Sequence, residues 1–169
     1  MKHLKNLVLA ATILFGSTSI INAQSKVAHI NTQELIAAMP DYKAAQAEMD
    51  KLSKTYEVQI QEMGTEYQNK IKQYDAEAST KTQEENQKRV QEVTEMEQSI
   101  RKFQSQAQQE MQKKEFDLLK PITEKAKAAI IKVGKAQGFQ YVLDSTQGQG
   151  VILADGKDLM ADVKKELGF

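Results

Sequence analysis

Few residues of this chain have the type and spacing that catalysis or cofactor binding requires. There is no cysteine, and the two histidines, His3 and His29, lie far apart, so the usual ligands of a metal centre do not cluster in the sequence. Gly148-Gln-Gly150 lacks the third glycine of a dinucleotide-binding fingerprint, and residues 150–157 match a phosphate-binding loop only loosely, because Asp158 stands where that loop needs serine or threonine. Turn glycines explain both stretches better. We therefore expect neither an enzyme nor a cofactor.

Charged side chains are abundant but balanced. Residues 41–120 carry sixteen acidic and thirteen basic side chains, intermixed along the sequence. Such mixing is typical of a solvated, ion-paired helix surface and not of paired catalytic carboxylates. The whole chain has 23 basic and 23 acidic residues. Without net charge there is no field that favours nucleic acid or anionic lipid, so we expect no nucleic-acid partner.

The charged side chains lie on a long stretch, residues 41–120, that has no proline and one glycine, Gly64. Its apolar residues recur every three or four positions, and Met49 and Ile60 stand eleven residues apart in one phase. An eleven-residue repeat keeps an apolar stripe on one face of a nearly straight helix. A second stripe with the same spacing begins at Met96. Two matched stripes joined by a polar bend predict a long antiparallel helical hairpin.

The polar bend carries residues suited to start a helix. Thr82 and Glu85 have the spacing of a capping box, in which each side chain binds a backbone N–H of the first turn. Beyond it, charged residues such as Arg89 occupy positions where the stripe should be apolar. We expect Val90 and Val93 to provide what packing there is at this end, which predicts low local stability.

The segments on either side of the hairpin are short and of mixed character. Pro121 is expected to end the second arm, because proline removes a backbone N–H and crowds the preceding turn. The expected elements are a strand over 26–30, a helix over 33–39, a helix over 122–135 that Gly138 stops, a hairpin of strands over 139–144 and 151–154, and a closing helix over 159–167. The predicted fold is α+β but mostly α, with a long hairpin arm projecting from a small β-rich oligomerisation body.

The body segments, residues 24–40 and 121–169, total about 65 residues, too few for an independent core of normal stability. Their apolar strand residues must nevertheless be buried. Sheet pairing between subunits is the simplest solution, so the sequence predicts an obligate oligomer. The expected oligomerisation residues are Val27, Ile30, Tyr141, Val142, Leu143, Val151, Ile152 and Leu153.

The N-terminus has the pattern of a secretory signal peptide: Lys2 and Lys5, an apolar run over 7–15, then small residues. We expect cleavage after about Ala23, which leaves 21 basic and 23 acidic residues because only two lysines are lost. The apolar run is too short to span a bilayer comfortably. An uncleaved membrane anchor is the less favoured alternative, and no stable membrane insertion is expected.

The chain resembles the Skp/OmpH family of periplasmic chaperones. The most specific part of the resemblance is the tail Gly138-Phe-Gln-Tyr-Val-Leu-Asp144, followed by Gly156-Lys-Asp-Leu-Met-Ala-Asp-Val-Lys-Lys165, and the signal peptide and long hairpin agree with it. Members are homotrimers in which a β-rich body holds three hairpins around a cavity. They hold unfolded outer-membrane proteins in the periplasm without ATP. The resemblance implies the same location, partners and architecture here, with residues 24–40 and 121–169 as the body and residues 41–120 as the client-binding arm.

The resemblance also implies that inner faces of the arms contact the client. Methionine adapts to varied partners, and tyrosine combines an apolar body with a polar tip. The candidate client-binding residues are Met49, Leu52, Tyr56, Met63, Tyr67, Tyr74, Met96, Ile100, Phe103 and Met111. The same residues are the expected packing seam between the helices, and the sequence does not separate the two roles. The alternative function is a structural periplasmic coiled-coil spacer or adaptor that binds a folded partner.

Overall fold

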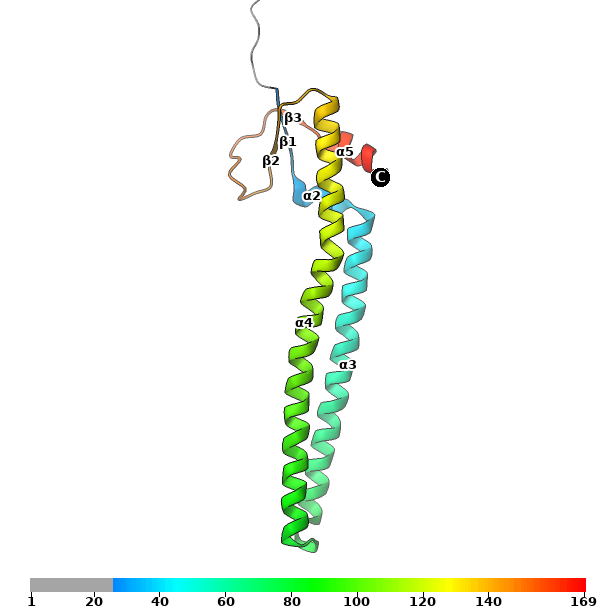
Figure 1. Ribbon diagram of the computed structural model, residues 1–169, viewed down its shortest axis with the longest axis vertical. Coiled ribbons are helices and arrows are strands. Elements are labelled where there is room, and N and C mark those ends of the chain that lie inside the picture. Colours follow the sequence, from blue (N-terminus) through cyan, green and yellow to red (C-terminus); the bar gives the residue numbers. More distant parts are fainter. Residues whose placement is uncertain (1–25) are drawn as a thin grey trace, which may run out of the picture.

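The computed structural model describes residues 26–169, and two long helices dominate it (Figure 1). These are α3, Pro40–Glu77, and α4, Gln83–Ala136, joined by a short 3₁₀ turn, η1, Ala78–Thr80. The other elements are β1, Val27–Ile30; α2, Thr32–Ala38; β2, Tyr141–Asp144; β3, Lys157–Asp158; and α5, Met160–Leu167. The prediction of a mostly helical chain with a small sheet is confirmed. The predicted signal peptide, residues 1–23, lies outside the described residues.

Helices α3 and α4 lie side by side along the whole of α3 (Figure 1). Their contacts pair residues in opposite order along the chain: Asp41 binds Lys125 at 2.7 Å near the sheet, and Lys70 binds Glu92 near η1. With 38 residues, α3 is about 57 Å long at 1.5 Å per residue. The pair of helices therefore forms a long arm, and η1 is its tip.

The tip is closed by the predicted capping box. Glu85 N donates to Thr82 Oγ1 at 3.2 Å, and Thr82 N donates to the Glu85 carboxylate at 2.9 Å. These bonds satisfy backbone N–H groups that the first turn of α4 leaves free. They also hold the pKa of Glu85 below its ordinary value, the backbone bond from Thr82 contributing most. The start of α4 is therefore set by local chemistry.

The sheet has the order β2-β1-β3, and both neighbours run parallel to β1. The prediction of a hairpin with a second strand over 151–154 is wrong: those residues are irregular, and β3 is Lys157–Asp158. Parallel strands cannot be joined by a tight turn and need a crossover of about a dozen residues. Residues 145–156 form that crossover, from β2 on one side of β1 to β3 on the other.

Pro121 lies inside α4 and does not end it, so the predicted break and the separate helix over 122–135 are wrong. Proline removes one helical hydrogen bond, which destabilises an isolated helix. Here the following turns are held by burial, because Ile122, Ala126, Ala129 and Val133 all pack into the core. One continuous helix therefore belongs to both the arm and the body.

The core lies where α4 crosses one face of the sheet. Ala28 and Ile30 point to that face from β1, and they pack with Leu35 of α2 and Val163 of α5; each is at most 1% exposed. The body segments of one chain, which include the end of α4, thus pack around one small core. The predicted helix end at Gly138 is confirmed. Gly138 lies just after α4 and has φ +74°, the left-handed conformation that glycine adopts most easily.

Candidate functional site

All ten candidate client-binding residues lie along the seam between α3 and α4. Each is half-buried, and only Ala45 and Ala107 are fully buried within residues 41–120. Two helices can cover each other on one side only, so the apolar seam stays partly open to solvent along both flanks. The structure brings these residues together as helix packing. Their contact with a client stays a prediction.

The middle of the seam is held by an aromatic pair. The rings of Tyr56 and Phe103 meet edge to face with their centroids 5.9 Å apart, a favourable geometry for two quadrupoles. The Tyr56 hydroxyl donates to the Glu110 carboxylate, and this bond raises the pKa of Tyr56. The polar end of this tyrosine is therefore used to join the two helices.

Near the tip, charged side chains gather around Tyr74. The Arg89 guanidinium lies 4.5 Å from the centre of the Tyr74 ring, and the Lys70 ammonium lies 5.4 Å from it. The Tyr74 hydroxyl and Lys70 both donate to Glu92, while Arg89 pairs with Glu77. Cation–π contacts and ion pairs hold this end of the arm where apolar contacts are few.

These contacts change the acidity of the groups involved. Hydrogen bonds from Lys70 and then Tyr74 hold the pKa of Glu92 below its ordinary value of 4.5. Glu92 and Tyr74 in turn raise the pKa of Lys70. The pKa of Glu77 is lowered by Gln73 and by Arg89. The tip cluster is therefore bound most strongly when both carboxylates are ionised.

Val90 does not pack in the seam as predicted, since it is 64% exposed. Arg89 and Val93, four residues apart on α4, face α3 and are half-buried. Val90 follows Arg89 by one residue and is rotated by about 100° away from that face. Arg89 therefore occupies the place in the seam where Val90 was predicted to pack.

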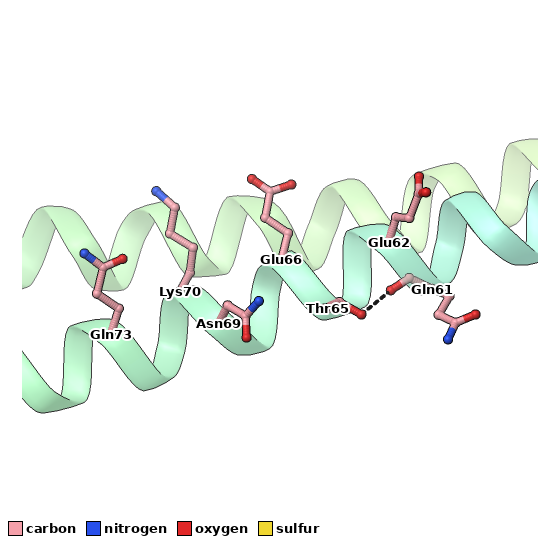
Figure 2. Close-up of a pocket in the computed structure, with 7 residues that line it drawn as sticks. All are labelled: Gln61, Glu62, Thr65, Glu66, Asn69, Lys70 and Gln73. Atoms are coloured by element: carbon pink, nitrogen blue, oxygen red, sulfur yellow. Dashed lines mark hydrogen bonds between the residues drawn. The ribbon is translucent and has the colours of Figure 1, made fainter.

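One hollow on α3 has none of the features of a ligand-binding pocket. It measures about 530 Å³ and is lined by Gln61, Glu62, Thr65, Glu66, Asn69, Lys70 and Gln73. Figure 2 shows these side chains spreading from a single helix, with a hydrogen bond from Thr65 to the Gln61 carbonyl. No apolar side chain lines it, and no convergent group would hold a small ligand. This hollow is a solvated helix surface.

Three of the eight predicted oligomerisation residues lie on the outer face of the sheet, and two more are exposed in the crossover. Val27, Tyr141 and Leu143 are 40%, 60% and 44% exposed, and Ile152 and Leu153 in the crossover are 102% and 76% exposed. Ile30 and Val142 instead point to the inner face and contribute to the core of their own chain. Val151 is half-buried. One chain by itself thus leaves an apolar face uncovered beside its own core.

Comparisons with known proteins identify the family. The profile described as outer membrane protein (OmpH-like) matches residues 26–167. The chain belongs to the OmpH-like family. The crystal structure of an OmpH-like candidate outer membrane chaperone from Caulobacter crescentus superposes with a TM-score of 0.77 at 19% identity, covering 86% of this chain and 85% of that one. No curated protein matches the chain. The predicted resemblance is confirmed, and the structural likeness extends over both arm and body.

Polar groups in the body of this OmpH-like chain have structural partners. His29 lies 3.3 Å from Ser145 Oγ and 3.2 Å from the Gly156 carbonyl, so it ties the two ends of the crossover together. Burial raises the pKa of Asp144, but hydrogen bonds from Thr146 and Thr32 outweigh it and lower the pKa overall. Within residues 26–169 no cluster of three or more His, Asp or Glu side chains is placed to hold a metal ion.

Some exposed apolar residues were not singled out from the sequence. Phe116 is 64% exposed, with Lys120 5.9 Å from its ring centre, and Ile131 is 44% exposed. Both lie outside the phase of the seam, and an isolated apolar residue out of phase gives no sequence signal. Across the described residues, no helix is long and apolar enough to serve as a membrane span.

Proposed function

We propose that this OmpH-like chain is an ATP-independent holdase chaperone of the periplasm, which binds unfolded outer-membrane proteins and prevents their aggregation on the way to the outer membrane. Family membership supports this proposal, as does the fold shared with the Caulobacter candidate chaperone. The observation that carries it is the arm itself: a seam of half-buried methionine, tyrosine and aliphatic side chains that continues over most of α3. An extended client segment needs a long surface of this kind, whereas a small ligand needs a closed pocket.

The proposed assembly is a homotrimer built on the outer face of the sheet. Val27, Tyr141 and Leu143 leave that face apolar in a single chain, and Ile152 and Leu153 in the crossover are exposed as well. Burying an apolar side chain of this size contributes about 1.5–3 kcal/mol relative to leaving it exposed. A shared body would cover these side chains and would let three arms project around a common cavity for the client.

Binding in such a cavity is proposed to depend on many weak contacts. A half-buried seam residue has only part of its area left to offer, so each contact with a client contributes at most about 1–2 kcal/mol. Many contacts of this size retain an unfolded chain without trapping it, and release needs no ATP. The flexible methionines allow the same surface to accept different sequences.

The test uses the mature chain, residues 24–169, and an outer-membrane β-barrel protein unfolded in urea. On dilution without nucleotide, the client aggregates alone, and we expect this chain to suppress the light scattering with saturation near three chains per client. A folded barrel added as a control should not be bound. No suppression at any ratio, combined with saturable binding to a folded partner, would instead support the spacer or adaptor function.

The proposed location is tested separately. A chain exported to the periplasm and processed after Ala23 should begin at Gln24 when it is purified from the periplasmic fraction. N-terminal sequencing that begins at Met1, with the protein in the membrane fraction, would contradict the location.

A further inference from the structure

The two flanks of the α3–α4 seam differ in how they are closed. Within residues 26–169, the carboxylates and lysine of α3 that form ion pairs with α4 are Asp41, Glu48, Lys70 and Glu77. Asp41 and Glu48 are seven residues apart, as are Lys70 and Glu77, and Lys70 follows Glu48 by two eleven-residue repeats. They therefore share one side of α3. We call this side the ion-paired flank.

The other side of the seam, the open flank, has no ion pair between α3 and α4 in the described part of the chain. Near the body it forms a groove of about 370 Å³. Its large apolar residues are Tyr42, Met49, Leu118 and Leu119, and Ala45 and Gln46 also line its α3 wall. The groove is bounded by two helices, unlike the hollow of Figure 2, and its floor is the apolar seam.

The open flank continues along the arm through the eleven-residue repeat. Ser53 and Gly64 follow Tyr42 at this spacing, so small side chains stand where the tyrosine stood. A Cβ atom added to Gly64 would meet nothing within 4 Å, which shows that the surface there is open. Ile60 follows Met49 in the same way and is half-buried. Beside Ser53 and Gly64 the apolar strip of this flank is thus bordered by small side chains.

Two carboxylates without an ion pair in the described structure border the groove. Asp50 lies on its α3 side and Glu115 on its α4 side, whereas the larger groove on the ion-paired flank mixes Glu48, Lys51 and Lys114. An apolar groove edged only by negative charge complements a segment that carries apolar and positive side chains together.

We infer that the open flank is the surface that contacts the client, and that its groove binds unfolded segments in which apolar side chains adjoin Lys or Arg. This inference rests on the proposed holdase function. The ion-paired flank then serves to hold the two helices together, because its charged groups already bind one another and would lose their surrounding water, at a cost in free energy, if a client covered them.

The absence of cysteine from the chain allows a direct test by site-specific crosslinking. Gln46→Cys places a photo-crosslinker on the open flank, and Thr55→Cys, also at an exposed position, places it in the groove of the ion-paired flank. With a urea-diluted β-barrel client, we expect the first variant to capture several times more client than the second. Both variants should suppress aggregation as the unmodified chain does.

Charge selectivity is tested with two unfolded model peptides that alternate leucine with lysine or leucine with glutamine. The Asp50→Asn, Glu115→Gln double variant should bind the lysine peptide a few-fold more weakly and the glutamine peptide unchanged, a size typical of exposed ion pairs. Asp117→Asn, on the ion-paired flank, is the matched control and should leave both affinities unchanged.

Three results would overturn the inference. Equal or greater capture from Thr55→Cys would place the client on the other flank. Crosslinks between copies of the chain at Gln46, formed without client, would make the open flank a subunit contact. Unchanged affinity of the double variant for the lysine peptide would remove the charge preference. If the unmodified chain fails to suppress aggregation, the proposed function itself is contradicted, independently of the flank.

Discussion

The same substitution at two helical glycines should change stability in opposite directions. In α3, Gly64→Ala adds a methyl group where no atom lies within 4 Å. In α4, Gly134→Ala places a Cβ atom 2.9 Å from Val142 Cγ2, closer than real Cβ atoms approach. Both glycines lie inside helices, so both substitutions gain the same difference in helix propensity, about 1 kcal/mol.

The size of each stability change depends on whether the atoms around the added methyl group can move. At Gly64 nothing opposes the gain, and the free energy of unfolding should rise by about 0.5–1 kcal/mol. At Gly134 the contacting side chain belongs to β2, where Val142 is paired with Ala28 of β1. Relieving the overlap must shift the strand or rotate a β-branched side chain, at a cost of about 1–3 kcal/mol. The net effect of Gly134→Ala is a loss of up to about 2 kcal/mol.

Urea unfolding followed by circular dichroism at several chain concentrations measures both changes and separates folding from association. The midpoint should rise for Gly64→Ala and fall for Gly134→Ala. A second substitution, Val142→Ala, should restore the stability of Gly134→Ala relative to Val142→Ala alone, because it removes the overlapping methyl group. Equal stabilisation by both alanines would show that α4 does not pack on β2 as described.

Three further predictions concern the tip and the body. Thr82→Ala removes the cap of α4 and should cost about 1 kcal/mol, seen as faster amide exchange near the tip. The lowered pKa values of Glu77 and Glu92 mean that their stabilisation is present above pH 4.5 and is lost as the pH falls below that value. The midpoint of thermal unfolding should therefore be level from pH 7 to about 5 and then decline, less steeply for Glu92→Gln. An equally steep decline in that variant would contradict the role of Glu92. Leu153→Ser should weaken the oligomer in sedimentation experiments, whereas Val58→Ser, also exposed but on the arm, should not; equal effects would argue against the body as the contact.

The parts of the fold that local patterns determine could be predicted from the sequence. The eleven-residue repeat specified the seam, and every one of its predicted client-binding residues is half-buried as a seam residue should be. The capping box at Thr82 and the end of α4 before Gly138 depend on a few neighbouring residues and were also predicted correctly. Which of these seam residues touch a client depends on a partner, and the sequence of one chain does not contain it.

The errors occurred where distant segments decide the local structure. Residues 151–154 have strand character, but β1 is already flanked by β2 and β3, and these residues serve as the crossover between them. Pro121 is tolerated because Ile122 and the turns after it are buried against the body. At Val90, the rotation of α4 exposes an apolar side chain and buries most of Arg89 in its place. The difference between the two flanks likewise depends on which charges of α3 face α4.

The central claim is that several copies of this chain share one body and hold a single unfolded client between their arms. Native mass spectrometry of the mature chain mixed with a urea-diluted outer-membrane β-barrel protein measures this directly. We predict a complex of three chains and one client, formed without nucleotide, and free trimers when the client is omitted. A folded single chain that remains monomeric and leaves the client unbound would contradict the claim.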